Sequence, residues 1–197
     1  QYLNGYFRSQ EGEWDSNGQV LWVLGKYYQF TNSEPKTDWL KYITKGGNWI
    51  VHKRIMNEEG TAHHGLLPAG FSAEHLGPND YYYWDDLWSV AGLKSASILL
   101  KDKFKKESDF FRDQSKDIMK AINESLEQAK ERIGTNAMPA SPYRRLDSGA
   151  IGSICGAYPL DIMEYSDERI VKTVNFLMDN CLVKNGFFHD MIHSGIN

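Results

Sequence analysis

Six segments of the chain carry apolar residues at the three- to four-residue spacing of a helix. We find no convincing pattern of alternating apolar and polar residues that would indicate a half-buried strand. The pattern therefore predicts an all-α protein. The expected helices are residues 16–31, 37–55, 85–103, 108–133, 148–158 and 167–182.

These expected helices differ in how much of their surface is apolar. The third is apolar nearly all round, which predicts a helix buried on most sides. The fourth has one apolar stripe and is otherwise charged, so we expect it on the outside. Gly46 and Gly47 lie inside the second helix and predict either a break or a close helix contact. Ser166 is the expected N-cap of the sixth.

The links between the expected helices alternate in length. Short links, at residues 32–36, 104–107 and 161–166, favour antiparallel helical hairpins. Long links, at residues 56–84 and 134–147, should then gather at one end of the assembly. Loops held by a rigid scaffold are where binding and catalysis usually occur.

An acidic residue opens each odd-numbered helix. Asp15 follows Trp14, Asp85 follows Trp84, and Asp147 precedes Ser148. Helix capping is the simpler explanation, because an aspartate accepts bonds from the free N–H groups of a helix start. Three such acids at one end of the assembly, two of them preceded by tryptophan, exceed what capping requires.

Alternating inner and outer helices, with long loops and acids at one end, indicate an (α/α)6 toroid. A closed toroid of this type takes six hairpins, and about three are present here, so residues 1–197 are expected to form part of a toroid domain. An open arrangement of this kind exposes apolar flanks of inner helices. We therefore expect self-association, or pairing with the missing half of the barrel, and little hydrolase activity from these residues alone.

Composition excludes several classes of protein. Hydrophobic residues make up 41% and charged residues 24% of the chain, which fits a globular domain. The net charge of −4 argues against a nucleic-acid partner. No apolar run approaches the roughly 18 residues of a membrane span, and the cytoplasm is the favoured location. Cys155 and Cys181 are expected as buried thiols, and neither a metal nor a cofactor is expected.

Four stretches in order resemble a known group of enzymes. The stretch NDYYYWDDLW, residues 79–88, resembles the aromatic-Trp-Asp signature of trehalases and related six-hairpin glycosidases. Three further stretches resemble glucoamylase-like hydrolases: GEWDSNGQVLWVLGKYYQFTNS (12–33), GLLPAGFSAEHLGP (65–78) and PASPYRRLDSGAIGS (139–153). The resemblance implies hydrolysis of α-linked glucosides or oligosaccharides, and it implies that Trp84 and Asp85 bind the sugar.

Glycoside hydrolysis by inversion needs a proton donor and a second carboxylate that activates water. Glu74, in the longest loop, and Asp86 are the expected catalytic pair. For Glu74 the alternative is a solvated loop residue. The expected sugar-binding residues are the acids at the helix starts with their aromatic and basic neighbours: Trp14, Asp15, Tyr83, Trp84, Asp85, Arg144, Arg145 and Asp147. Salt bridging is the alternative role of the two arginines.

Two rival functions stay open at this point. The first is another toroid enzyme, a phosphorylase or a polysaccharide lyase, although only Arg144 and Arg145 offer a basic phosphate pocket. The second is a catalytically incomplete carbohydrate-binding or interaction module. Sugar-dependent stabilisation without release of reducing sugar favours the binding module.

Overall fold

The computed structural model describes residues 1–10, 12–71, 79–183 and 186–187. In this part of the chain the protein is helical, apart from one antiparallel pair of two-residue strands, β1 (Leu182–Val183) and β2 (Gly186–Phe187). The helices are α1 (Ser16–Thr31), α2 (Thr37–Lys53), α3 (Tyr83–Leu100), α4 (Lys105–Ile133), the 3-10 helix η1 (Ser148–Gly156) and α5 (Glu168–Asn180). The all-α prediction is therefore confirmed.

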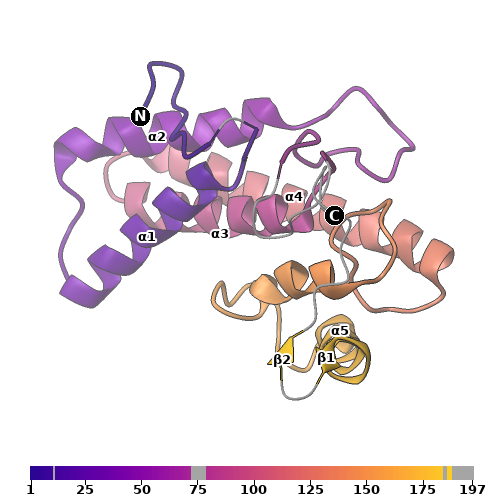
Figure 1. The fold of residues 1–197 in the computed structure, drawn as a ribbon. Coiled ribbons are helices and arrows are strands. Elements are labelled where there is room, and N and C mark those ends of the chain that lie inside the picture. The colour runs from indigo at the N-terminus through magenta and orange to yellow at the C-terminus, as the bar shows by residue number, and fades with distance from the viewer. Residues whose placement is uncertain (11, 72–78, 184–185, 188–197) are drawn as a thin grey trace.

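The first four helices pack as two antiparallel pairs (Figure 1). Asn17, at the start of α1, donates to the carbonyl of Gly46 in α2 over 2.9 Å, and the Tyr28 hydroxyl near the end of α1 accepts from the N–H of Lys36 over 3.3 Å. The Tyr83 and Ser125 hydroxyls join the start of α3 to the second half of α4 over 2.8 Å. A short link therefore joins the two helices of each pair.

Glycine allows α1 and α3 to approach closely. A Cβ at Gly18 would overlap the backbone of Trp88, and a Cβ at Gly92 would lie 2.7 Å from the Cα of Gly18. Seven residues further on, a Cβ at Gly25 would lie 2.9 Å from the Ser95 Cβ. The contact advances in the same direction on both helices, so α1 and α3 run parallel.

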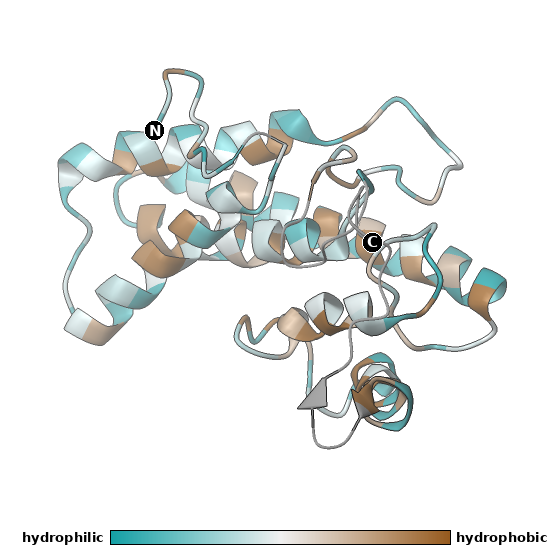
Figure 2. Cartoon of the chain, viewed as in Figure 1, coloured by the Kyte–Doolittle hydropathy of each residue, from teal (hydrophilic) through white to brown (hydrophobic). Residues whose placement is uncertain are grey.

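The core lies around α3. Tyr83, Leu87, Leu93 and Leu100 are all almost inaccessible to solvent, as the apolar pattern predicts for a helix covered on most sides. The outer helix α4 buries Phe111, Ile118, Ile122 and Leu126 and keeps a charged face in solvent. Figure 2 shows hydrophobic residues alternating with hydrophilic ones along these helices.

Three local expectations are corrected or refined. The segment expected as a fifth α-helix is the 3-10 helix η1, whose sequence SGAIGSICG is rich in glycine and small residues that hold an α-helix weakly. The N-cap of α5 is Asp167 and not Ser166, because the Asp167 carboxylate accepts the N–H of Arg169. Gly46 and Gly47 do not break α2; the ring of Phe111 packs where a Gly47 side chain would stand.

The segment from η1 to α5 lies to one side of the four longer helices (Figure 1). The hydroxyl of Thr173 in α5 accepts the backbone N–H of Met138 over 2.8 Å, and Arg169 donates to Asn123 of α4 over 2.6 Å. Both cysteines are buried, and the described residues contain no disulfide. Within this segment η1 packs on α3, and α5 packs on η1.

Candidate functional site at the starts of α1, α3 and η1

The starts of α1, α3 and η1 lie at one end of the molecule, together with the two long loops. The N–H of Tyr83 donates to the carbonyl of Ala140 over 3.1 Å. The Ser141 hydroxyl donates to Asp80 over 2.7 Å. Both long loops therefore meet at the N-terminus of α3, where the sequence predicted a site.

Asp15 and Trp84 form the contact that joins the first two helix starts. The Asp15 side chain is 4% exposed, and its Oδ2 accepts the indole N–H of Trp84 over 2.8 Å and the amide of Gln19 over 2.7 Å. Asp15 occupies the N-cap position of α1, yet its side chain makes no capping hydrogen bond within the described chain. Capping alone therefore does not account for this acid.

Trp14 precedes Asp15 in the sequence, but its side chain contacts the long loop and α2. Its indole N–H donates to the carbonyl of Ala69 over 3.3 Å, and Lys53 Nζ lies 3.9 Å from the centroid of its ring system. The ring also packs near Trp49 at 6.1 Å. Trp14 therefore binds the long loop to α2, beside the site.

Asp85 follows Trp84 in the first turn of α3 and is 2% exposed. Its charge acts on two neighbouring groups from different elements. Burial is the main cause of the raised pKa of Cys155 in η1, and Asp85 adds to it. Burial also raises the pKa of Tyr82, against the lowering effect of Arg144, with Asp85 again adding to the rise. The Asp85 side chain, at the start of α3, therefore lies close to η1.

Asp86 points in a different direction from Asp85, as adjacent helix positions about 100° apart must. Its Oδ1 accepts the N–H of Leu67 over 2.8 Å, and its Oδ2 has no hydrogen-bond partner in the described part of the chain. Burial raises the pKa of Asp86 to about 8, although the Leu67 N–H and the charge of Arg54 lower it. The side chain is 1% exposed, so the segment around Leu67 covers it.

Tyr83 also points away from the site. Its ring is fully buried against α4, where its hydroxyl bonds to Ser125, and burial raises its pKa. Glu74 lies outside the described residues. The structure therefore brings Asp15 and Trp84 together, and it places Asp85 near η1. Tyr83 and Asp86 point away from both.

The third helix start is built around Asp147. Its Oδ1 accepts the N–H of Gly149 over 2.9 Å, which is a capping bond. Its Oδ2 lies 3.3 Å from Arg144 and 3.5 Å from Arg145. Arg144 also donates to the Tyr82 hydroxyl over 3.4 Å. Both arginines therefore have an acidic neighbour, which weakens the case for a phosphate pocket.

A hydrogen-bonded chain beside the site was not foreseen. His63 is buried, with Nδ1 at 2.6 Å from the Tyr143 hydroxyl and Nε2 at 2.7 Å from Glu58. Its ring stacks on Tyr81 at 4.2 Å, with the planes 9° apart. His63 and Tyr143 are 80 positions apart in sequence, so no local pattern could have predicted that they meet.

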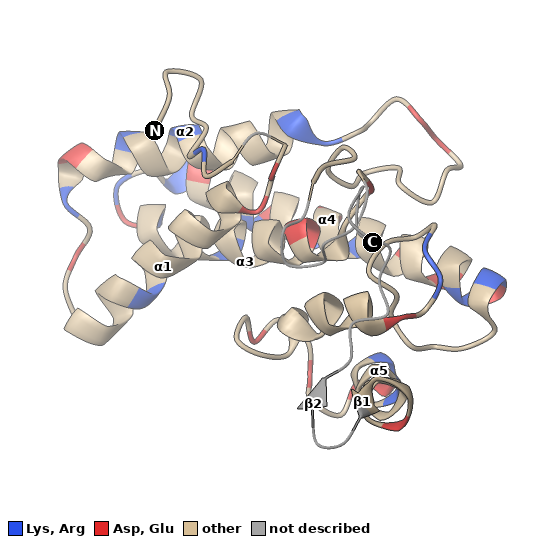
Figure 3. Ribbon diagram, in the orientation of Figure 1, with Lys and Arg blue, Asp and Glu red and all other residues tan. Residues whose placement is uncertain are grey.

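Comparison of the chain with protein-family models, with curated proteins and with solved structures found no match. Among the described residues, no helix has the length and apolar character needed to cross a membrane. Figure 3 shows lysine and arginine interspersed with aspartate and glutamate over the helices and loops.

Proposed function

We propose that the end of the molecule where α1 and α3 begin binds α-linked glucosides or oligosaccharides, as part of a glycoside hydrolase that works by inversion. The observation that carries this proposal is the contact between Asp15 and Trp84. It fixes an indole ring and a buried carboxylate together at the meeting point of two helices and two long loops. Sugars suit such a pair, because their C–H faces pack on aromatic rings and their hydroxyls donate to carboxylates.

Asp85, which follows Trp84 in the sequence, supplies a second carboxylate at the start of α3. Arg144 and Asp147 extend the polar lining across the third helix start. Asp15 and Asp85 are both buried at the starts of α1 and α3, and the hydroxyl groups of a sugar are donors that a carboxylate can accept. We assign Asp15, Trp84 and Asp85 to the sugar and Arg144 and Asp147 to the wall of the site.

The proposed architecture is the (α/α)6 toroid, with about three of its six hairpins in these 197 residues. The parallel run of α1 and α3, each with an antiparallel partner, supports this arrangement. Inner helices of a toroid run parallel and present their N-terminal ends to the same side. The acids at the starts of α1, α3 and η1 then lie on one face.

Catalysis would need two placed carboxylates, roughly 6.5–9.5 Å apart for inversion. Glu74 and Asp86 remain the proposed pair. A pKa of about 8 suits Asp86 to donate a proton at neutral pH. Because Asp86 is covered, that role also requires the segment around Leu67 to move away from it.

Isothermal titration calorimetry with maltose and trehalose tests the binding proposal. In Asp85→Asn the residue keeps its shape and loses the charge that accepts a hydroxyl. A charge-assisted hydrogen bond contributes roughly 1.5–3 kcal/mol, so affinity should fall about tenfold or more. Asp179→Asn, on the exposed face of α5, is the matched control and should bind as the wild type does. Equal affinity in all three proteins would rule out the site.

Release of reducing sugar from maltose, trehalose and soluble starch tests how much of the catalytic machinery these residues hold. Binding without release agrees with a carbohydrate-binding module and also with the expectation of little activity from part of a toroid. Release that requires inorganic phosphate supports a phosphorylase. Turnover near about 1 per second, within the usual enzyme range, would overturn the expectation that these residues hold only part of the catalytic machinery.

A further inference from the structure

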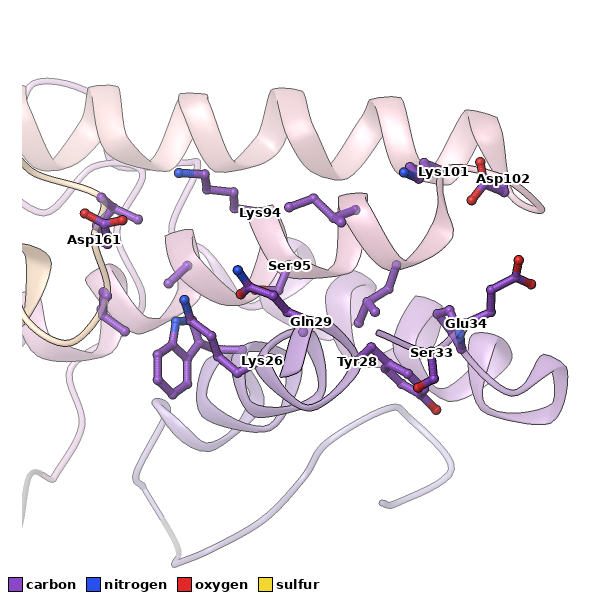
Figure 4. A pocket seen from close by; sticks show the side chains of 18 residues that line it. Lys26, Tyr28, Gln29, Ser33, Glu34, Lys94, Ser95, Lys101, Asp102 and Asp161 are labelled. Carbon is purple, nitrogen blue, oxygen red and sulfur yellow. The ribbon is translucent and has the colours of Figure 1, made fainter. Parts of the chain in front are cut away.

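A cavity of about 500 Å³ lies on the flank of α1 and α3, toward their C-terminal ends and away from the acidic helix starts (Figure 4). The loop at residues 160–162 closes its third side. Cavities that hold small organic ligands usually measure about 300–1,000 Å³. The size of this one therefore suits an organic ligand rather than an ion.

The lining combines an aromatic wall with many hydrogen-bonding groups. Trp22 forms part of the wall, and Lys26 Nζ lies 5.5 Å from the centroid of its ring system. Figure 4 shows the Gln29 amide beside Ser95, on the facing sides of the two helices. An amide and a hydroxyl can both donate and accept, which matches the hydroxyl groups of a sugar.

The charges around the cavity balance. Three lysines and three acids line it: Lys26, Lys94, Lys101, Glu34, Asp102 and Asp161. A phosphate-bearing ligand or a nucleic acid requires a clear excess of positive charge, and a cationic ligand requires the reverse. The balance favours a neutral ligand that carries many hydroxyl groups.

A row of indole rings connects this cavity with the acidic end. Trp84, at the start of α3, lies 5.6 Å from Trp88 between ring centroids, and Trp88 lies 5.5 Å from Trp22. Trp84 bonds to Asp15 at one end of the row, and Trp22 lines the cavity at the other. Trp88 itself is buried, so the three rings form a packed row that joins the two regions, with Trp22 and Trp84 partly exposed at its ends.

We propose that this cavity is a second sugar-binding subsite, which holds the far part of a neutral oligosaccharide whose other end occupies the acidic site. This inference rests on the proposed function and specifies its substrate more closely. It assigns a substrate of several glucose units, longer than a disaccharide. Short sugars then need only the acidic site, whereas long ones contact both.

Calorimetric titration of maltose and maltoheptaose against three variants tests the subsite. Gln29→Ala removes an exposed side chain, so the fold should persist, and Trp22→Phe shortens the aromatic wall. Gln128→Ala, on the exposed face of α4, is the matched control. Loss of one hydrogen bond in Gln29→Ala should lower the affinity for maltoheptaose roughly two- to tenfold. Maltose affinity should stay at the wild-type value in every variant.

The possible results separate the subsite from the proposed function. If maltoheptaose binds no more tightly than maltose, or if Gln29→Ala and Trp22→Phe bind it as Gln128→Ala does, the subsite is refuted while sugar binding stands. If the wild type binds neither sugar at millimolar concentration, the proposed function and the subsite fall together. A third result would be a mass in solution twice that of one chain, which Gln29→Ala lowers without changing sugar affinity. In that case a second copy of the chain occupies the cavity, which also refutes the subsite.

Discussion

The buried carboxyl of Asp86 should make the protein less stable as the pH rises. Its pKa is about 8 in the folded protein, against 3.8 for an ordinary aspartate. Between these values the folded protein holds one proton that the unfolded chain has released. The free energy of unfolding therefore decreases by about 1.4 kcal/mol per pH unit from this group, and the accumulated loss at pH 7 is about 4 kcal/mol.

The substitution Asp86→Asn isolates this effect. The asparagine oxygen can still accept the N–H of Leu67, but the side chain no longer titrates. Its amide group lacks acceptors in the described surroundings of Oδ2, which lowers stability by a similar amount at every pH. This loss is the same at both pH values. It therefore cancels when the stability difference between Asp86→Asn and the wild type at one pH is subtracted from the difference at the other.

Urea unfolding at pH 5 and pH 7 gives the required quantities for the wild type, for Asp86→Asn and for Asp179→Asn as the exposed control. From pH 5 to pH 7 the stability of Asp86→Asn relative to the wild type should rise by about 3 kcal/mol. The relative stability of the control should stay nearly constant. A change below about 0.5 kcal/mol for Asp86→Asn would show that Asp86 is already ionised in the folded protein, contrary to this reasoning.

Three further outcomes are expected. Gly18→Ala should lower the stability by about 1–3 kcal/mol in urea unfolding, because the added methyl group overlaps the backbone of Trp88. Tyr83→Phe should lower it by about 1 kcal/mol, because the buried Ser125 hydroxyl loses its partner, and a thermal melt measures the loss. Phe30, which is 84% exposed on α1, should contribute to self-association. Sedimentation equilibrium should therefore give a lower average mass for Phe30→Glu than for the wild type. Equal masses would argue against a role of this surface in association.

The positions of the helices could be predicted well from sequence, because apolar spacing and helix-ending residues are local signals. The expected helix at residues 16–31 has the observed bounds, and Asn32 ends it in the left-handed conformation. The fourth helix ends at Gly134 in the same way. The segment at 148–156 has apolar residues at helical spacing too, but its glycines favour a tighter 3-10 turn, which spacing alone does not distinguish.

The site could be predicted only in part. Trp84 and Asp15 meet, although 69 positions separate them, because they stand at the starts of the parallel helices α3 and α1. The direction of each side chain within the first turn of α3 could not be predicted, since it depends on how the helix is rotated against its neighbours. Tyr83 faces α4 and Asp86 faces the Leu67 segment for that reason.

The close crossing of α1 and α3 has a consequence for how accurately the site is held. With no side chain between Gly18 and Gly92, main-chain atoms of the two helices rest directly on one another. Main-chain contacts have no rotamers to change, so the separation between the helix starts varies less than it would across a layer of flexible side chains. Asp15 stands about one helical turn before Gly18, and Trp84 stands about two turns before Gly92. Their mutual distance is thus set by two backbones in contact, and under the proposed function a sugar would meet a carboxylate and an indole whose spacing is fixed before it arrives.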